Sequence, residues 1–195
     1  METVGLINYI LSITFTVFYL YQFIYILAPI IKRSKPEPAA AIMHRYGVLI
    51  SARNEETVIA QLIENIREQN YPSDLVTVFV VADNCSDNTA KVARDAGAVV
   101  YERLNEQQVG KGYALDFLLA RINEDYPRDA FDGFFIFDAD NLLDENFISE
   151  MNKTFSQGYK IITSYRNSKN YDASWISAGY SLWFLRESQF LNYSR

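Results

Sequence analysis

Residues 46–69 read "YGVLISARNEETVIAQLIENIREQ", a short apolar run that passes through a polar turn into a longer periodic segment. An apolar run of this length, bounded by polar residues, is typical of a strand buried in a sheet. The segment after it repeats apolar side chains at the spacing of one helix face, at Val58, Ile59, Leu62, Ile63 and Ile66. The stretch therefore predicts a buried strand at 46–51 and a helix at 55–69.

The same alternation of strand and helix continues along the chain. Further strands are predicted at residues 75–82, 98–103, 133–138 and 159–166, and further helices at 86–97, 110–126, 145–158 and 173–192. Gly97 is expected to end one helix and Asp144 to cap the start of another. Strands that alternate with helices predict an α/β fold with a doubly wound, mostly parallel sheet. Ligands of such sheets bind beyond the carboxyl ends of the strands.

The first residues form a different kind of segment. From Thr3 to Ile31 the chain carries no charge, and about 20 apolar residues are enough to cross a bilayer. The basic residues follow this run rather than precede it, which argues against a cleaved signal peptide. We therefore expect one N-terminal transmembrane helix, with a signal peptide or a buried globular helix as the alternatives.

The charges after the apolar run predict its orientation. Lys32, Arg33 and Lys35 place that side of the membrane in the cytoplasm by the positive-inside rule. The expected organisation is a transmembrane anchor at 1–34, a linker at 35–45 and a cytoplasmic globular domain at 46–195. The protein is thus predicted to cross the plasma membrane once.

Composition excludes several classes of function. The chain has 195 residues, a net charge of −6, one cysteine and one histidine. A single cysteine, Cys85, excludes an intrachain disulfide, and a zinc site of Cys and His would lack ligands. His44, in the linker, is expected to be solvated. The acidic balance excludes nucleic acid as a partner, since nucleic acid needs a basic face.

The strand predicted at 133–138 runs into two carboxylates, Asp138 and Asp140. If strand geometry persists, side chains two positions apart point the same way. Two carboxylates that close repel each other unless a positive group lies between them. Hard oxygen ligands suit Mg²⁺ or Mn²⁺, so the pair predicts a metal site. The alternative is an acidic strand end in a solvated turn.

Polar residues also follow the other predicted strands. Asp83 follows the second predicted strand, where it either accepts hydrogen bonds from a base or ribose or starts an Asx turn. Lys111, in "VGKGYAL", opens a helix, and a lysine at a helix N-terminus suits a phosphate group. The alternative for Lys111 is an exposed side chain in a flexible turn. Neither a GxGxxG nor a P-loop motif is present, which weakens dinucleotide-binding and P-loop readings.

Four motifs, "LISARNEE", "VVADNCSDNT", "GKGYALD" and "FDADNLL", occur in this order and resemble those of glycosyltransferase family 2. The resemblance covers roughly residues 46–170 and implies the GT-A fold, a nucleotide-sugar donor that is usually UDP-linked, and Mg²⁺ or Mn²⁺. It implies that Asp83 contacts uracil, that Lys111 approaches the nucleotide, and that Asp138 and Asp140 form the metal-binding DxD motif, with Asp138 nearer the ribose. The implied lining of the nucleotide pocket is Ala52, Arg53, Asn54 and Glu55.

The sequence departs from the family pattern after these motifs. The family's general base lies in a later acidic motif, often Thr-Glu-Asp, and synthase-like members continue with Gln-x-x-Arg-Trp; neither is present. Asp172 and Glu187 are acids in the later part of the chain, but nothing identifies either as the base. We therefore expect an N-terminal portion of a longer enzyme that holds the donor half, with its catalytic base unassigned.

The resulting hypothesis is an inverting hexosyltransferase of polysaccharide biosynthesis at the cytoplasmic membrane face, with a carbohydrate or lipid-linked acceptor. One alternative is a phosphohydrolase of the haloacid-dehalogenase type, which also uses an Asp-x-Asp pair. That pair belongs after the first strand and has Thr or Val two positions on, where this chain has Leu142. The other alternative is a non-catalytic, membrane-tethered nucleotide-binding or interaction module.

Overall fold

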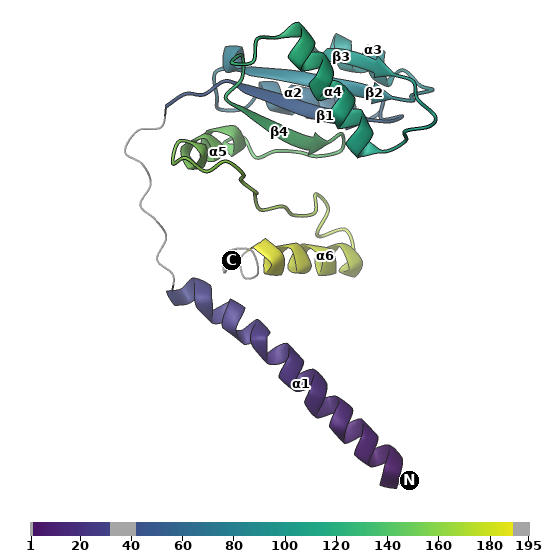
Figure 1. Cartoon of the computed structure of the whole chain (residues 1–195), viewed down its shortest axis with the longest axis vertical. Coiled ribbons are helices and arrows are strands. Elements are labelled where there is room, and N and C mark those ends of the chain that lie inside the picture. The colour runs from purple at the N-terminus through teal and green to yellow at the C-terminus, as the bar shows by residue number, and fades with distance from the viewer. Residues whose placement is uncertain (1, 32–41, 189–195) are drawn as a thin grey trace. The chain divides into compact units, whose positions relative to one another are not determined.

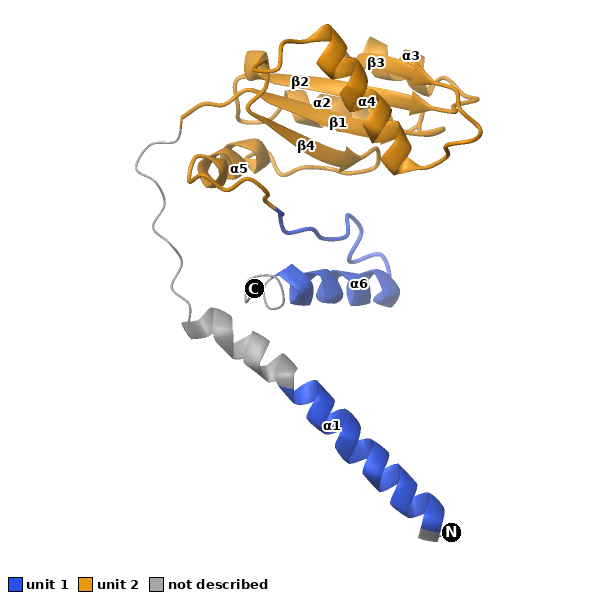
Figure 2. Cartoon of the chain, in the orientation of Figure 1, with its two compact units in different colours: residues 1–37, 163–195 blue, residues 38–162 orange. Residues whose placement is uncertain are grey.

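The computed structural model describes residues 2–31 and 42–188. The chain divides into two compact units, Pro38–Ile162 and Met1–Glu37 together with Thr163–Arg195 (Figure 2). Lys32, Arg33 and Lys35, on which the predicted orientation depends, lie outside the described residues, as does most of the predicted linker. The orientation across the membrane therefore stays a prediction.

The larger unit is built on a parallel sheet, as the alternating pattern predicts. Its strands are β1 (Tyr46–Ala52), β2 (Val76–Asp83), β3 (Val99–Arg103) and β4 (Gly133–Asp138). Their order is β3-β2-β1-β4, and every pairing between them is parallel (Figure 1). The strand order reverses at β1, because β2 and β3 lie on one side of it and β4 lies on the other.

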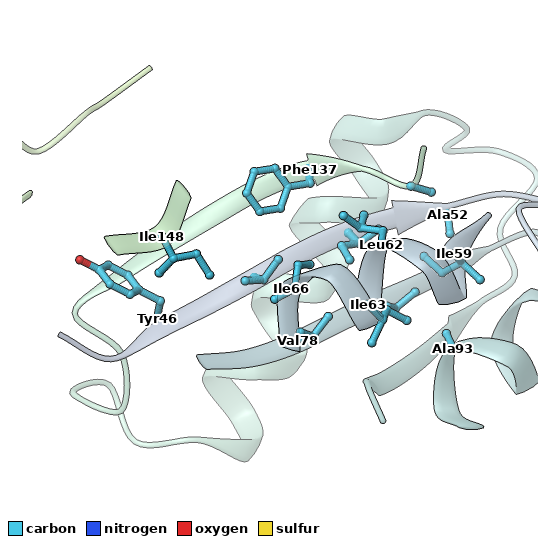
Figure 3. Packing of buried hydrophobic residues seen from close by; sticks show 14 of the residues in the cluster. Tyr46, Ala52, Ile59, Leu62, Ile63, Ile66, Val78, Ala93, Phe137 and Ile148 are labelled. Carbon is cyan, nitrogen blue, oxygen red and sulfur yellow. The ribbon is translucent and has the colours of Figure 1, made fainter. Parts of the chain in front are cut away.

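Helices cover both faces of this sheet. They are α2 (Ile59–Arg67), α3 (Thr89–Asp95), α4 (Lys111–Asp125) and α5 (Phe147–Phe155), with a short 3-10 turn, η1, at Ser73–Leu75. One core contains Val48 and Ile50 of β1 together with the apolar residues of α2. Figure 3 shows the α2 residues Ile59, Leu62, Ile63 and Ile66 of this core. The opposite core packs Leu49 of β1 against α4, including Leu118. Successive β1 residues thus serve opposite faces, as strand geometry requires.

The predicted helix ends are partly right. Gly97 follows α3 with φ of 95°, a left-handed conformation that glycine adopts without strain. The prediction that Asp144 caps the next helix is wrong, because α5 begins at Phe147 and its N-cap is Asn146. The Asp144 carboxylate instead accepts a hydrogen bond from the Asn146 N–H at 3.0 Å. The Asp144 side chain thus stabilises the turn that precedes α5 and does not cap the helix itself.

The strand predicted at 159–166 is not formed, since residues 159–166 contain no strand in the part of the chain that the structure describes. Ile161 is 89% exposed and Tyr165 is 50% exposed. Tyr159, Ile161, Ile162 and Thr163 favour strand geometry, but a strand also needs a neighbour for its backbone groups. Propensity alone therefore overestimated the sheet.

The described residues of the smaller unit form the helices α1 (Glu2–Ile31) and α6 (Trp175–Arg186). The segment Thr3–Leu20 of α1 has a mean hydropathy of 1.6 and is long and apolar enough to cross a membrane. No side chain of this segment is buried. The predicted last helix is present as α6. Glu187, which follows α6, forms an ion pair with Arg166, with 3.9 Å between Oε2 and Nη2.

His44 is not the solvated linker residue that its position suggests. Its ring packs edge-on against Phe155 at 4.9 Å, and its Nδ1 lies 3.7 Å from Asp132. The adjacent backbone is held by Tyr71, whose hydroxyl accepts from the His44 N–H and donates to the His44 carbonyl. Residues just before β1 are thus part of the packed unit.

Candidate functional site

The acidic strand ends gather along one edge of the sheet. The register places Ser51 beside Asp138, and Asp83 beside Arg103. Ala52, the last residue of β1, lies beside Ala82. Because all four strands are parallel, these residues share the carboxyl edge. This edge, where the strand order reverses, is the usual ligand position in doubly wound sheets.

Asp138 and Asp140 lie at this edge but not in one continuous strand. β4 ends at Asp138, and the chain turns so that the Asn141 N–H donates to the Asp138 carbonyl at 3.1 Å. The Asn141 side chain accepts from the Asp138 N–H in return, also at 3.1 Å. Both aspartates are exposed while Ala139 between them is buried. The turn thus leaves two carboxylates at the surface.

Lys111 is brought directly to this pair. It is the first residue of α4, and its N-cap is Gly110, whose φ of 132° is one that other residues rarely adopt. The Lys111 ammonium forms an ion pair with Asp138. The two side chains are 46% and 63% exposed, so the pair is accessible to solvent. An exposed pair of this kind is worth about 0–1 kcal/mol, so a ligand can displace it at little cost.

Asp83 is held in a different way. Its carboxylate Oδ1 accepts from Arg103 Nη1 at 2.6 Å and from Asn84 Nδ2 at 3.1 Å. Both members of the ion pair have side chains only 5% exposed. Among the described residues, no hydrogen bond is made to the second oxygen, Oδ2. An ionised carboxylate can only accept, so Oδ2 keeps capacity for a further hydrogen-bond donor.

The loop after β1 is locked to the loop after β2. Asn54 has φ of 57° and its side-chain oxygen accepts from the Ser86 N–H at 2.8 Å. The Glu55 N–H donates to the Thr89 hydroxyl at 2.8 Å. That hydroxyl donates to Asp87 at 2.6 Å, and this bond lowers the pKa of the Asp87 carboxyl. The two loops therefore form one supported rim.

Not every predicted site residue takes part in a contact at this edge. Ala52 is buried at the end of β1, and its carbonyl lies 3.5 Å from the Cys85 sulfur. Arg53 is exposed, and Glu55 is partly exposed. No described contact joins their side chains to the Lys111–Asp138 pair. Their roles remain predictions.

The residue that sequence reasoning missed is Arg103. A charged residue that ends a strand is normally solvated, so nothing in its neighbourhood along the chain marks it as buried. Its position could have indicated the contact, because Arg103 ends β3, the next strand after the one that ends at Asp83. In a parallel sheet, such neighbouring strand ends meet.

The residues present fit a divalent metal that arrives with its ligand. No group of three or more His, Cys, Asp or Glu side chains among the described residues is arranged to hold a metal ion. Mg²⁺ and Mn²⁺, however, are commonly bound by one or two carboxylates together with substrate phosphates. Asp138 and Asp140 supply that number of exposed carboxylates. They suit a metal site that the ligand completes.

Comparison with known proteins agrees with this architecture. The family model described as glycosyltransferase-like family 2 matches residues 44–195. A mannosyltransferase from Pyrobaculum calidifontis, solved in complex with GDP-Man and Mn²⁺, is 21% identical with a TM-score of 0.50. The match covers 72% of this chain and 39% of that one. It confirms the predicted GT-A fold.

Similarity to a curated relative is more local. The 4,4'-diaponeurosporenoate glycosyltransferase of Staphylococcus aureus is 41% identical over 66 residues, which are 34% of this chain and 16% of the relative. Staphylococcus aureus TarS 1-349, solved in complex with UDP-GlcNAc, is 17% identical with a TM-score of 0.47. That match covers 58% of this chain and 31% of TarS 1-349. The chain therefore spans well under half the length of these relatives.

Proposed function

The chain belongs to the glycosyltransferase-like family 2, and we propose that its carboxyl sheet edge binds the nucleotide diphosphate of a UDP-sugar together with Mg²⁺ or Mn²⁺. The observation that carries the proposal is the ion pair between Lys111 and Asp138. It brings a cation at a helix N-terminus next to an exposed carboxylate, the two charges that a metal-bound diphosphate needs. Helix N-termini favour anions for the same reason.

Each residue at the edge has a part in this proposal. Lys111 exchanges Asp138 for a phosphate oxygen when the ligand enters, and Asp138 and Asp140 hold the metal. The metal supplies positive charge to the diphosphate, which stabilises it as a leaving group. Asp83 accepts the N3–H of uracil through Oδ2. The loop after β1, with Ala52, Arg53, Asn54 and Glu55, lines the nucleoside side.

The whole protein's activity is proposed from family membership. We propose that it is an inverting hexosyltransferase that acts in polysaccharide biosynthesis and transfers the donor sugar to a hydroxyl of a carbohydrate or lipid-linked acceptor. We also propose that α1 anchors it to the plasma membrane with the larger unit in the cytoplasm. The length and apolar composition of α1 support the anchor.

The test is calorimetric titration of the full chain in detergent with UDP, with and without Mn²⁺. We expect UDP to bind only with Mn²⁺, and Asp140→Ala to abolish this Mn²⁺-dependent binding. Asp95→Ala is the matched control, because Asp95 is an exposed acid whose partner is Lys91 in α3. GDP in place of UDP tests the choice of base. If a folded chain bound neither nucleotide, the acidic edge would be a structural turn and the non-catalytic module would be favoured.

A further inference from the structure

Arg103 lies where two parts of the proposed nucleotide site meet. It is the last residue of β3 and lies beside Asp83 in the sheet register. Nη1 of its guanidinium donates to Asp83 Oδ1 at 2.6 Å. Nη2 donates to the Gln108 carbonyl at 2.7 Å. One planar group thus contacts both the nucleoside-side carboxylate and the loop that leads to Lys111.

That loop, residues 104–110, is held at several further points. The Asn105 side-chain oxygen accepts from the N–H groups of Gln107 and Gln108 at 3.0 and 2.9 Å. The Asn105 backbone bonds in both directions with the side chain of Asn84. Asn84 itself donates to Asp83. The loop is therefore fixed to the end of β2 by the same network that orients Asp83.

The burial of the pair explains why an arginine is suited to this position. A guanidinium offers five donors in a rigid fork, so it can serve a carboxylate and a carbonyl at once, whereas an ammonium acts as a point charge. Arg103 also compensates the Asp83 charge, since a buried charge without a partner is costly.

We infer that Arg103 is a positioning residue that couples the nucleobase subsite to the phosphate subsite. It keeps Asp83 oriented so that Oδ2 faces a base N–H. Through Gln108 it also fixes the loop that sets the place of Lys111. This inference rests on the proposed function and adds to it a residue that touches neither base nor phosphate.

The variant that separates the two contacts is Arg103→Lys. Lysine keeps a positive charge beside Asp83, but its single nitrogen does not reproduce the rigid fork whose two nitrogens contact Asp83 and Gln108 separately. We therefore expect Arg103→Lys to weaken UDP binding in Mn²⁺ about tenfold, the size of one lost charge-assisted hydrogen bond. Uridine, which has no phosphate, should lose less than about twofold, because the retained positive charge still pairs with Asp83 and only the contact to the loop is lost. A merely structural role would lower both affinities together.

A double-mutant cycle with Lys111→Met tests whether Arg103 acts through Lys111. If it does, Arg103→Lys should have little further effect on UDP binding once Lys111 is absent, since coupled residues are non-additive. Equal losses for UDP and uridine, or additive losses in the cycle, would overturn the inference. A wild-type chain that binds neither UDP nor GDP would instead overturn the proposed function.

Asn105→Ala tests the same inference if Arg103→Lys fails to fold. Asn105→Ala releases the loop at Gln107 and Gln108 without touching the buried ion pair. It should show the same signature, with UDP weakened about tenfold and uridine nearly unchanged. Unchanged UDP affinity in folded Asn105→Ala would contradict a role for the loop in placing Lys111. Hydrogen exchange of peptides from β2 and β3 confirms that each variant is folded.

Discussion

Replacement of Lys111 by methionine should change two affinities in opposite directions. Lys111 forms an ion pair with Asp138, and both side chains are about half exposed, at 46% and 63%. An exposed pair contributes about 0–1 kcal/mol to stability, so Lys111→Met should fold normally. The free chain would then present Asp138 without its competing cation. The nucleotide would in turn lose a charge-assisted contact to phosphate.

Coulomb's law sets the size of the first effect. Two unit charges about 4 Å apart interact by about 1 kcal/mol in water, and a divalent ion doubles this to about 2 kcal/mol. Removal of the ammonium should therefore tighten Mn²⁺ binding to the free chain by up to ~30-fold, and by less as salt screens the charges. In Mn²⁺, UDP should bind more weakly by about 2 kcal/mol, the value of a hydrogen bond to a charged group.

The assay measures free Mn²⁺ by electron paramagnetic resonance and UDP binding by calorimetry on the same preparations. Lys91→Met is the matched control. It removes the same charge, and Lys91 also forms an exposed ion pair, with Asp95 within α3. It should change neither affinity. If Lys111→Met left Mn²⁺ affinity unchanged, Asp138 would not be a metal ligand beside Lys111. If it left UDP affinity unchanged, Lys111 would have no place in the phosphate subsite.

Two further predictions concern the frame that carries the site. Asn152 is 2% exposed and accepts from the Tyr46 hydroxyl at 2.8 Å while donating to the Ile42 carbonyl at 2.9 Å. Asn152→Leu should lower the free energy of unfolding by about 2–4 kcal/mol, because it leaves both groups without this partner. Tyr46→Phe should cost only about 1 kcal/mol, because Tyr71 still bonds to Asn152; equal losses in urea denaturation followed by circular dichroism would contradict this. Burial, with the hydrogen bond to Asp125, raises the pKa of Tyr101 from 10.0 to about 12, so the unfolded chain loses this proton first and stability should fall between about pH 10 and 12. Tyr101→Phe should reduce that alkaline loss, and identical pH profiles of unfolding would refute the assignment.

Much of this protein follows from patterns that are local in the chain. The strand at Gly133–Asp138 was predicted with its observed bounds, and the helix that opens at Lys111 within one residue. The alternation of side chains along a strand and the repeat along a helix involve residues close in sequence, so both can be recognised without knowledge of the fold. A parallel sheet then places all strand ends on one edge, which is why polar residues that follow different strands, among them Asp83 and Asp138, lie along the same edge.

Pairings between distant residues were decided by packing. The Asp83–Arg103 bond joins residues 20 apart, and the Lys111–Asp138 pair joins residues 27 apart. The Tyr46–Asn152 bond spans 106 residues. No periodicity records such contacts, because they depend on strand order and register. For the same reason residues 159–166 did not form the predicted strand: intrinsic preference is local, whereas a strand exists only where a neighbouring strand accepts its hydrogen bonds.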